Sequence, residues 1–223
     1  MKVLGLDSAG GQCAVAVLDG ERVAAARAEA MMHGQAERLM PLIAEALAAA
    51  AIAPVALDLI AVTVGPGSFT GIRIGLAATR GLALATGRPA IGVGVFDAYA
   101  AAVPPAARQA RTLIVAVESK RDEFYLQAFK TAGAALAPPA QVHPRDLAAW
   151  LPAGPLLLAG DAAARLQAQL ADRDVVTAGT DLVDAVWVAR LGRVKVDGGI
   201  VEPLRPFYLR APDTTTPRRA AAP

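Results

Sequence analysis

The stretch KVLGLDSAGGQCAVAVL, residues 2–18, decides the fold class. It contains an apolar run that ends in Asp7, a group of small residues, and a second apolar run that begins at Cys13. Two short apolar runs joined by small residues predict a β-hairpin with the acidic residue at its mouth. A second hairpin is predicted over residues 113–130, where a polar turn separates two strands. The repetition indicates a duplicated α/β design with two lobes.

Helical and extended patterns alternate between and after the hairpins. Residues 21–30 alternate only weakly and fit either a third strand or a short helix. Pro41 is expected to end or kink any helix that begins well before it, because proline lacks an N–H and crowds the preceding turn. The remaining patterns predict helices over 35–51, 72–86, 162–171 and 184–196, and strands over 57–65, 88–95 and 154–161.

The lobes are expected to meet in the segment 101–110, which is rich in proline and alanine. The predicted limits are residues 1–103 for the N-terminal lobe and 104–210 for the C-terminal lobe, whose end is a candidate to cross back to the first lobe. The tail 211–223 has no apolar period and is predicted to be disordered.

Composition favours a soluble cytoplasmic protein. The net charge of +2 gives no strong field for nucleic acid, and 4% aromatic residues argue against a dedicated RNA-binding surface. The single cysteine, Cys13, cannot form an intramolecular disulfide, which fits a reducing compartment. The first residues are too weakly apolar for a signal peptide, and no apolar run has membrane-spanning length.

The stretch VGPGSFTGIRIG, residues 64–75, is a strand end, a glycine-rich turn and the start of a helix. The free N–H groups at such a helix start suit an anion, and Ser68 or Thr70 is expected to cap the helix. Many turns of this kind need glycine merely to reverse direction, so the motif is only moderately specific. Asp7 is the best single candidate for chemistry, although an acid that binds the N–H groups of its own turn is the favoured interpretation. The possible nucleotide- or anion-binding residues are Asp7, Ser8, Gly65, Gly67, Ser68 and Thr70.

The helices themselves point to a partner protein. Small residues form one stripe along the helix after the glycine-rich turn, and glycine inside a helix costs roughly 1 kcal/mol relative to alanine, so close approach of another backbone is expected. The stripe could instead pack on the protein's own sheet. The helix at 35–51 has one face suited to a core and a second, smooth alanine face, which indicates two neighbours. The predicted partner-binding residues are Leu39, Ala44, Ala48, Ala51, Gly71, Gly75, Ala78 and Leu82.

Five stretches together resemble the TsaB (YeaZ) family, whose members are needed to make N6-threonylcarbamoyladenosine in tRNA. The stretches are LGLDSAGGQCAVAV, HGQAERLMPLI, VTVGPGSFTGIRIGLAATRGLA, ESKRDEFYLQAF and PFYLR, in order over residues 2–210. The resemblance implies the two-lobed fold of actin, Hsp70 and sugar kinases. Departures from the family pattern fall at turn positions and put a nucleotide contact in the second lobe in doubt: Ser8 and Ala9, Gly34, and Glu118, Ser119 and Lys120.

The related TsaD family carries a metal-binding pair of histidines four residues apart, which lie on one helix face. The matching positions here are Val95 and Tyr99, and neither side chain is a comparable ligand. The two histidines of the chain, His33 and His143, lie in different lobes. We therefore expect no metal site, no cofactor and no catalytic residue.

The resemblance implies a non-catalytic, activating subunit that dimerises with a TsaD-like catalytic subunit. That partner would transfer threonylcarbamoyl from threonylcarbamoyl-AMP to the adenosine 3′ of the tRNA anticodon. A TsaE-like ATPase would be a third component, tRNA would be met through the complex, and a homodimer is expected when the partner is absent. The alternatives are a stand-alone nucleotide-dependent kinase or peptidase-like enzyme of the same fold, built on Asp7 and the Gly65–Gly71 loop, and a stand-alone tRNA-binding module.

Overall fold

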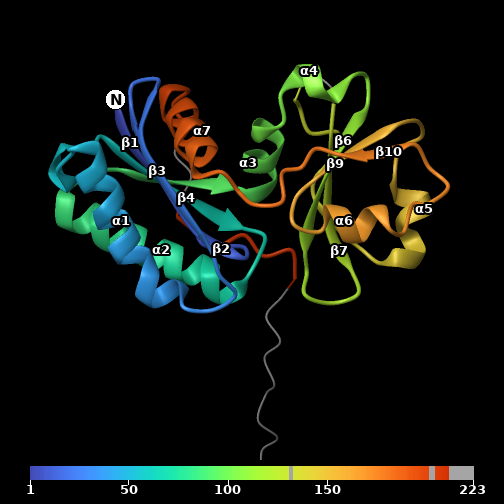
Figure 1. Ribbon diagram of the computed structural model, residues 1–223, viewed down its shortest axis with the longest axis horizontal. Helices are drawn as coiled ribbons and strands as arrows, with labels where there is room; N and C mark the ends of the chain where they lie inside the picture. Colours follow the sequence, from blue (N-terminus) through green and yellow to red (C-terminus); the bar gives the residue numbers. More distant parts are fainter. Residues whose placement is uncertain (131–132, 201–203, 211–223) are drawn as a thin grey trace, which may run out of the picture.

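The computed structural model describes residues 1–130, 133–200 and 204–210, so the tail predicted to be disordered lies outside the described residues. Two lobes stand side by side, each built on a five-stranded sheet (Figure 1). The first lobe contains β1 (Lys2–Asp7), β2 (Gln12–Asp19), β3 (Arg22–Ala30), α1 (Gln35–Ala50), the 3-10 helix η1 (Pro54–Ala56), β4 (Leu59–Gly65), α2 (Phe69–Thr86) and β5 (Ala90–Gly94). Between the lobes lie α3 (Val95–Ala102) and α4 (Pro105–Arg108).

The second lobe repeats the design with shorter elements. It contains β6 (Thr112–Glu118), β7 (Phe124–Phe129), β8 (Ala140–Val142), η2 (Pro144–Asp146), α5 (Leu147–Trp150), β9 (Leu156–Ala159), α6 (Ala163–Gln167) and β10 (Val175–Thr177). A final helix, α7 (Ala185–Asp197), follows. Helix α6 covers only Ala163–Gln167, so the helix predicted over residues 162–171 is shorter than expected.

The two sheets have the same topology, which confirms the predicted duplicated α/β fold. The strand orders are β3-β2-β1-β4-β5 and β8-β7-β6-β9-β10. In each sheet the central strand is antiparallel to its hairpin partner and parallel to the strand that follows the first crossover. The hairpins close with Asp7 opposite Ala14 in the first lobe and Glu118 opposite Phe124 in the second.

The hairpin β1–β2 is apolar almost throughout because both of its faces are covered. Helices α1 and α2 lie side by side on one face of the first sheet, and α7 lies with α3 on the other (Figure 1). Contact between α7 and β1 is so close that a Cβ atom at Gly5 would lie 2.8 Å from the backbone nitrogen of Ala189. The chain therefore crosses back to the first lobe after completing the second.

Two local expectations are decided by the structure. Residues 22–30 form strand β3, so the strand alternative for this segment is correct and the helix alternative is wrong. Pro41 does not end the helix, because α1 continues through it to Ala50, while the alternative of a kink at Pro41 stays a prediction. Pro41 lies on the exposed side of α1, and the carbonyl of Glu37 that loses its partner is on an exposed residue, where water can bind it.

Arg108 fastens the connection between the lobes. Its side chain is 3% exposed, and its guanidinium donates to the carbonyl oxygens of Ala100, Val103 and Lys130. Burial lowers the pKa of this guanidinium below its usual value. None of the helices within the described ranges is long and apolar enough to span a membrane.

Candidate functional site

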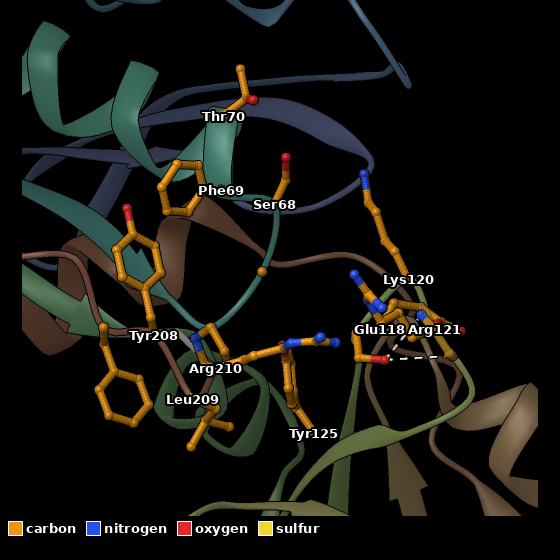
Figure 2. A pocket seen from close by; sticks show the side chains of 14 residues that line it. Ser68, Phe69, Thr70, Glu118, Lys120, Arg121, Tyr125, Tyr208, Leu209 and Arg210 are labelled. Carbon is orange, nitrogen blue, oxygen red and sulfur yellow. Dashed lines mark hydrogen bonds between the residues drawn. The ribbon is translucent and has the colours of Figure 1, made fainter. Parts of the chain in front are cut away.

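Turns from both lobes meet in the cleft between the sheets and enclose two cavities. The strap cavity, of about 450 Å³, lies between residues 66–70, the turn 118–121 and the C-terminal segment 207–210 (Figure 2). The hairpin cavity, of about 380 Å³, lies between residues 9–11 and Asp161. The residues that line both cavities are Gly67, Ser68, Glu118 and Lys120.

Asp7 lies at the floor of the cleft and is sealed from solvent. Its carboxylate accepts hydrogen bonds from the hydroxyl of Thr63 at 2.7 Å, the backbone N–H of Ala9 at 3.2 Å and the amide of Gln12 at 3.3 Å. Burial nevertheless raises the pKa of Asp7 above its ordinary value, because complete desolvation outweighs these three donors. The N–H of Ala9 is the turn bond expected of an acid that stabilises its own hairpin mouth.

The glycine-rich turn launches α2 as the sequence predicts. Gly65 has φ +112°, a conformation that favours glycine, and a Cβ atom there would collide with the carbonyl oxygen of Phe207. Ser68 is the cap: its Oγ accepts from the N–H of Gly71 at 3.3 Å, and its own N–H donates to the carbonyl of Ala9 at 2.7 Å. The N–H groups of Phe69 and Thr70 have no acceptor among the described residues.

The six possible nucleotide- or anion-binding residues therefore divide into two groups. Asp7 and Ser8 are 0% and 1% exposed and lie beneath α2, where the hydroxyl of Ser8 donates to the carbonyl of Gly71 at 2.9 Å. Gly65 is likewise buried. The other three line the strap cavity: Gly67, Ser68 and Thr70. An anion at the start of α2 would consequently contact this second group only, and its binding stays a prediction.

The second lobe contributes charges that sequence reasoning did not assign to the site. Glu118 is paired with Arg165 at 2.9 Å, and the guanidinium of Arg165 stacks 3.8 Å from the ring centroid of Phe124. Asp161 accepts the backbone N–H of Glu118 at 2.9 Å. Burial raises the pKa of Asp161 to about 6, and the neighbouring Glu118 and Asp7 carboxylates add to this shift. The signal in the sequence was the acid directly after an apolar strand at 154–161, since ligand sites of α/β folds gather at the carboxyl ends of parallel strands.

The positions that correspond to the TsaD histidine pair are closed. Val95 and Tyr99 are 2% and 3% exposed. The hydroxyl of Tyr99 donates to the carbonyl of Asp181 at 3.1 Å, and burial raises the pKa of this phenol, which keeps it protonated. Within residues 1–130, 133–200 and 204–210, no three His, Cys, Asp or Glu side chains are grouped so that they could hold a metal ion. His33 is exposed and does not cap α1, whose N-cap is Gly34.

The PFYLR stretch, residues 206–210, forms a strap across the first lobe. The N–H of Phe207 donates to the carbonyl of Val64 at 2.7 Å, and Tyr208 stacks on Phe69 with ring centroids 4.8 Å apart. Arg73 covers Phe69 at 3.7 Å from its ring centroid. Figure 2 shows these aromatic side chains on one side of the strap cavity and the side chains of Lys120 and Arg121 on the other.

Part of the predicted partner-binding surface is not available to a partner. A Cβ atom at Gly71 would collide with the carbonyl oxygen of Ser8, and one at Gly75 would lie 2.8 Å from the hydroxyl of Ser8. The prediction is wrong for these two glycines, because the protein's own β1–β2 hairpin turn packs against them. Leu39, at 1% exposed, belongs to the core, so this assignment is wrong too.

The rest of that surface remains open in varying degree. Ala78 and Leu82 are half-buried against the core. The alanine face of α1 is exposed, at Ala44, Ala48 and Ala51. The exposed small and apolar residues of α2 include Ala77, Gly81 and Leu84, the last with 88% of its surface exposed. These six exposed residues are called the outer helix surface below.

Two sheets of equal topology with a cleft between them define the two-lobed α/β fold shared by actin, Hsp70 and sugar kinases. Residues 29–183, more than half of the chain, match the family model described as TsaD: tRNA N6-adenosine threonylcarbamoyltransferase. The chain belongs to this family, on the branch of the TsaB (YeaZ) proteins.

The similar proteins include members of both the TsaB (YeaZ) and the TsaD groups. The chain is 32% identical over 126 residues to the tRNA threonylcarbamoyladenosine biosynthesis protein TsaB of Haemophilus influenzae, covering 56% of this chain and 52% of that protein. It is 42% identical over 74 residues to a tRNA N6-adenosine threonylcarbamoyltransferase of Anaeromyxobacter dehalogenans, covering 31% of this chain and 22% of that protein. The solved structure of YeaZ from Pseudomonas aeruginosa superposes with a TM-score of 0.75 at 28% identity, covering 93% and 99% of the two chains. The sequence matches thus span about half of one curated relative and about a fifth of the other.

Proposed function

We propose that this protein is a non-catalytic, activating subunit in the synthesis of N6-threonylcarbamoyladenosine in tRNA. It pairs with a TsaD-like catalytic subunit, which transfers the threonylcarbamoyl group to the adenosine 3′ of the anticodon. A TsaE-like ATPase completes the complex, and the chain meets tRNA through its partner. The names of the matching family and of its relatives direct the proposal to this modification.

The observation that carries the proposal is the outer helix surface. Two adjacent helices present small side chains and one almost fully exposed leucine to solvent, with no charge at these positions. A monomer gains nothing from exposing Leu84, whereas two helices of a second protein would bury it and approach the small residues closely. Charged residues flank the surface, among them Glu45 and Arg80, as at the rim of an interface.

The cleft supports the non-catalytic part of the proposal. Asp7, the best candidate for chemistry, is enclosed by its three donors and by α2. Val95 and Tyr99 fill the positions of the TsaD histidine pair with side chains that are inert at neutral pH. A stand-alone kinase or peptidase would need an accessible reacting group, and neither Asp7 nor Tyr99 is accessible.

Reconstitution tests the proposal. A purified TsaD-like partner, threonylcarbamoyl-AMP, unmodified tRNA and a TsaE-like ATPase are combined with and without this chain, and modified adenosine is quantified by mass spectrometry of nucleosides. We expect modification only in the complete mixture and none from the chain alone. Equal activity without the chain, or turnover of substrate by the chain alone, would overturn the proposal.

A further inference from the structure

The hairpin cavity has one acidic and one basic side chain that form no ion pair with any described residue. Asp161 uses one carboxylate oxygen to accept the N–H of Glu118, and no side chain of the described residues donates to either oxygen. Its second oxygen points across the cleft and lies 3.9 Å from the place that a Cβ atom would occupy at Gly10. The acid of the second lobe therefore lies next to the hairpin turn of the first lobe.

Lys120 supplies the basic group. It forms no hydrogen bond and no ion pair within 4.0 Å to any part of the chain that the structure describes. Its side chain extends from the β6–β7 turn toward the N-terminal hairpin of the first lobe (Figure 2). The nearby Glu118 does not neutralise it, because that carboxylate is held by Arg165 at 2.9 Å. A cation and an anion thus line the same cavity without forming a pair.

The other walls of the hairpin cavity are apolar. Met32 lies between β3 and α1, and Leu182 lies between β10 and α7. Both side chains line the cavity, and they are 68% and 43% exposed. The sulfur of Met32 lies 4.0 Å from the Cβ position of Gly11, so it rests against the hairpin turn. Two exposed apolar side chains converge on this one cavity. A ligand that removes them from water is therefore bound more favourably.

We propose that the hairpin cavity binds a small zwitterion with an apolar body, such as an α-amino acid, whose ammonium group contacts Asp161 and whose carboxylate contacts Lys120. Each charge of the ligand then meets an opposite charge that forms no ion pair within the described residues. The apolar body of the ligand contacts Met32 and Leu182. This proposal does not depend on the proposed function in tRNA modification.

A nucleotide fits the same walls poorly. Asp161 lines this cavity without a cation paired to it in the described chain, and its carboxylate would repel a polyphosphate strongly in a partly desolvated site. Lys120 is the one cation lining this cavity in the described chain. A ligand that carries one positive and one negative charge matches this lining better than one with several negative charges.

Calorimetric titration with L-leucine and two analogues tests the proposal. N-acetyl-leucine lacks the ammonium charge, and leucinamide lacks the carboxylate. At pH 7.5 we expect L-leucine to bind and both analogues to bind at least tenfold more weakly. Binding of an analogue as tight as that of L-leucine, or binding of Mg·ATP without binding of L-leucine, would overturn the proposal.

Variants locate the binding. Lys120→Met and Asp161→Asn are each expected to weaken L-leucine binding at least tenfold, whereas Lys130→Met, which replaces an exposed lysine outside both cavities, leaves it unchanged. Circular dichroism checks that each variant is folded; should Asp161→Asn fail to fold, Lys120→Met and the analogue series still decide. Unchanged binding by Lys120→Met would contradict the proposal.

The pH profile gives a separate readout. The charged and titratable groups facing Asp161 are Glu118 on β6, Asp7 on β1, Tyr99 on α3 and Lys120 on the β6–β7 turn. Because the pKa of Asp161 is about 6, we expect L-leucine affinity to fall as the pH drops from 7.5 through 6. An affinity that is flat over this range would argue against contact of the ligand with Asp161.

Discussion

The hydroxyl of Thr63 donates a 2.7 Å hydrogen bond to the carboxylate of Asp7, and so joins the ends of the parallel strands β4 and β1 beneath α2. Both residues are almost fully buried, at 1% and 0% exposed. The bond is therefore the main side-chain compensation for a carboxylate that has lost its water. Asp7 has the position expected of a catalytic acid, but through this bond it stabilises the hairpin instead.

Thr63→Val keeps the shape of the side chain and removes this donor. We expect the variant to lose about 1–3 kcal/mol of unfolding free energy, because a buried acceptor is left with fewer partners. Thr86→Val is the control: its hydroxyl bonds to Leu82 on a half-buried helix turn, and its loss should cost less than about 1 kcal/mol. Urea denaturation measures both, and equal costs would contradict the importance of the Asp7 contact.

Two glycines of α2 should respond oppositely to alanine. At Gly71 the new Cβ atom would collide with the backbone of Ser8, so we expect Gly71→Ala to destabilise the protein by roughly 1–3 kcal/mol or more. At Gly81 nothing lies within 4 Å of the Cβ position, so Gly81→Ala should stabilise it by roughly 0.5–1 kcal/mol through helix propensity. Thermal unfolding measures both shifts; a stable Gly71→Ala variant would show that the hairpin turn does not rest on α2.

Two tyrosines form another matched pair. The hydroxyl of Tyr99 donates to Asp181, and Tyr99→Phe should lose about 1 kcal/mol. The hydroxyl of Tyr208 is buried without a partner in the described chain, so Tyr208→Phe should be neutral or slightly stabilising. Chemical denaturation of the two variants in parallel gives the comparison. A larger loss for Tyr208→Phe than for Tyr99→Phe would contradict the hydrogen bond assigned to Tyr99 and the unpartnered hydroxyl assigned to Tyr208.

Asp161 makes stability depend on pH in a defined window. Its pKa of about 6 in the folded chain lies above the ordinary value of 3.8, so the folded state binds the proton more tightly than the unfolded state. This contribution is complete below pH 3.8 and is lost as the pH rises through 6. Relative to Asp161→Asn, the wild-type free energy of unfolding should therefore fall between pH 4 and 6.5 by on the order of 2 kcal/mol. Parallel pH profiles of the two proteins would refute the assignment.

The outer helix surface predicts how pairing can be broken. Ala48→Glu places a charge on this surface, where it would be desolvated by a partner, and we expect at least a tenfold weaker complex with the TsaD-like subunit. Ala49→Glu is the matched control, because Ala49 is also exposed but lies 100° further round the same helix. Affinity is measured by calorimetry after both variants are shown to be folded. Equal weakening by both would mean that the interface is misplaced.

The fold was predictable because its signals are local. Two apolar runs around the small residues after Asp7 predict the hairpin, and a second copy of the pattern at 113–130 predicts the second lobe. Residue type also narrowed the helix cap to Ser68 or Thr70, of which the structure selects Ser68. Such features depend on neighbours in the chain, which the sequence displays directly.

The site was predicted less well because its contacts are distant in sequence. Periodicity showed that Gly71 and Gly75 face a close neighbour, but it could not show that this neighbour is the turn at Ser8, 63 residues away from Gly71. The opposition of Asp161 to the first hairpin depends on how the lobes close, which no local pattern encodes. The same holds for the stacking of Tyr208 on Phe69.

The return of α7 to the first sheet affects how the protein is made. The face of β1 and β4 opposite α1 and α2 is covered by α7, with Gly5 against Ala189 and Gly192 against Ala61. During translation, α7 leaves the ribosome only after the entire second lobe has been synthesised. Until then one apolar side of the oldest part of the chain is bare, and it is exposed to chaperones and to aggregation for the time needed to add more than one hundred residues.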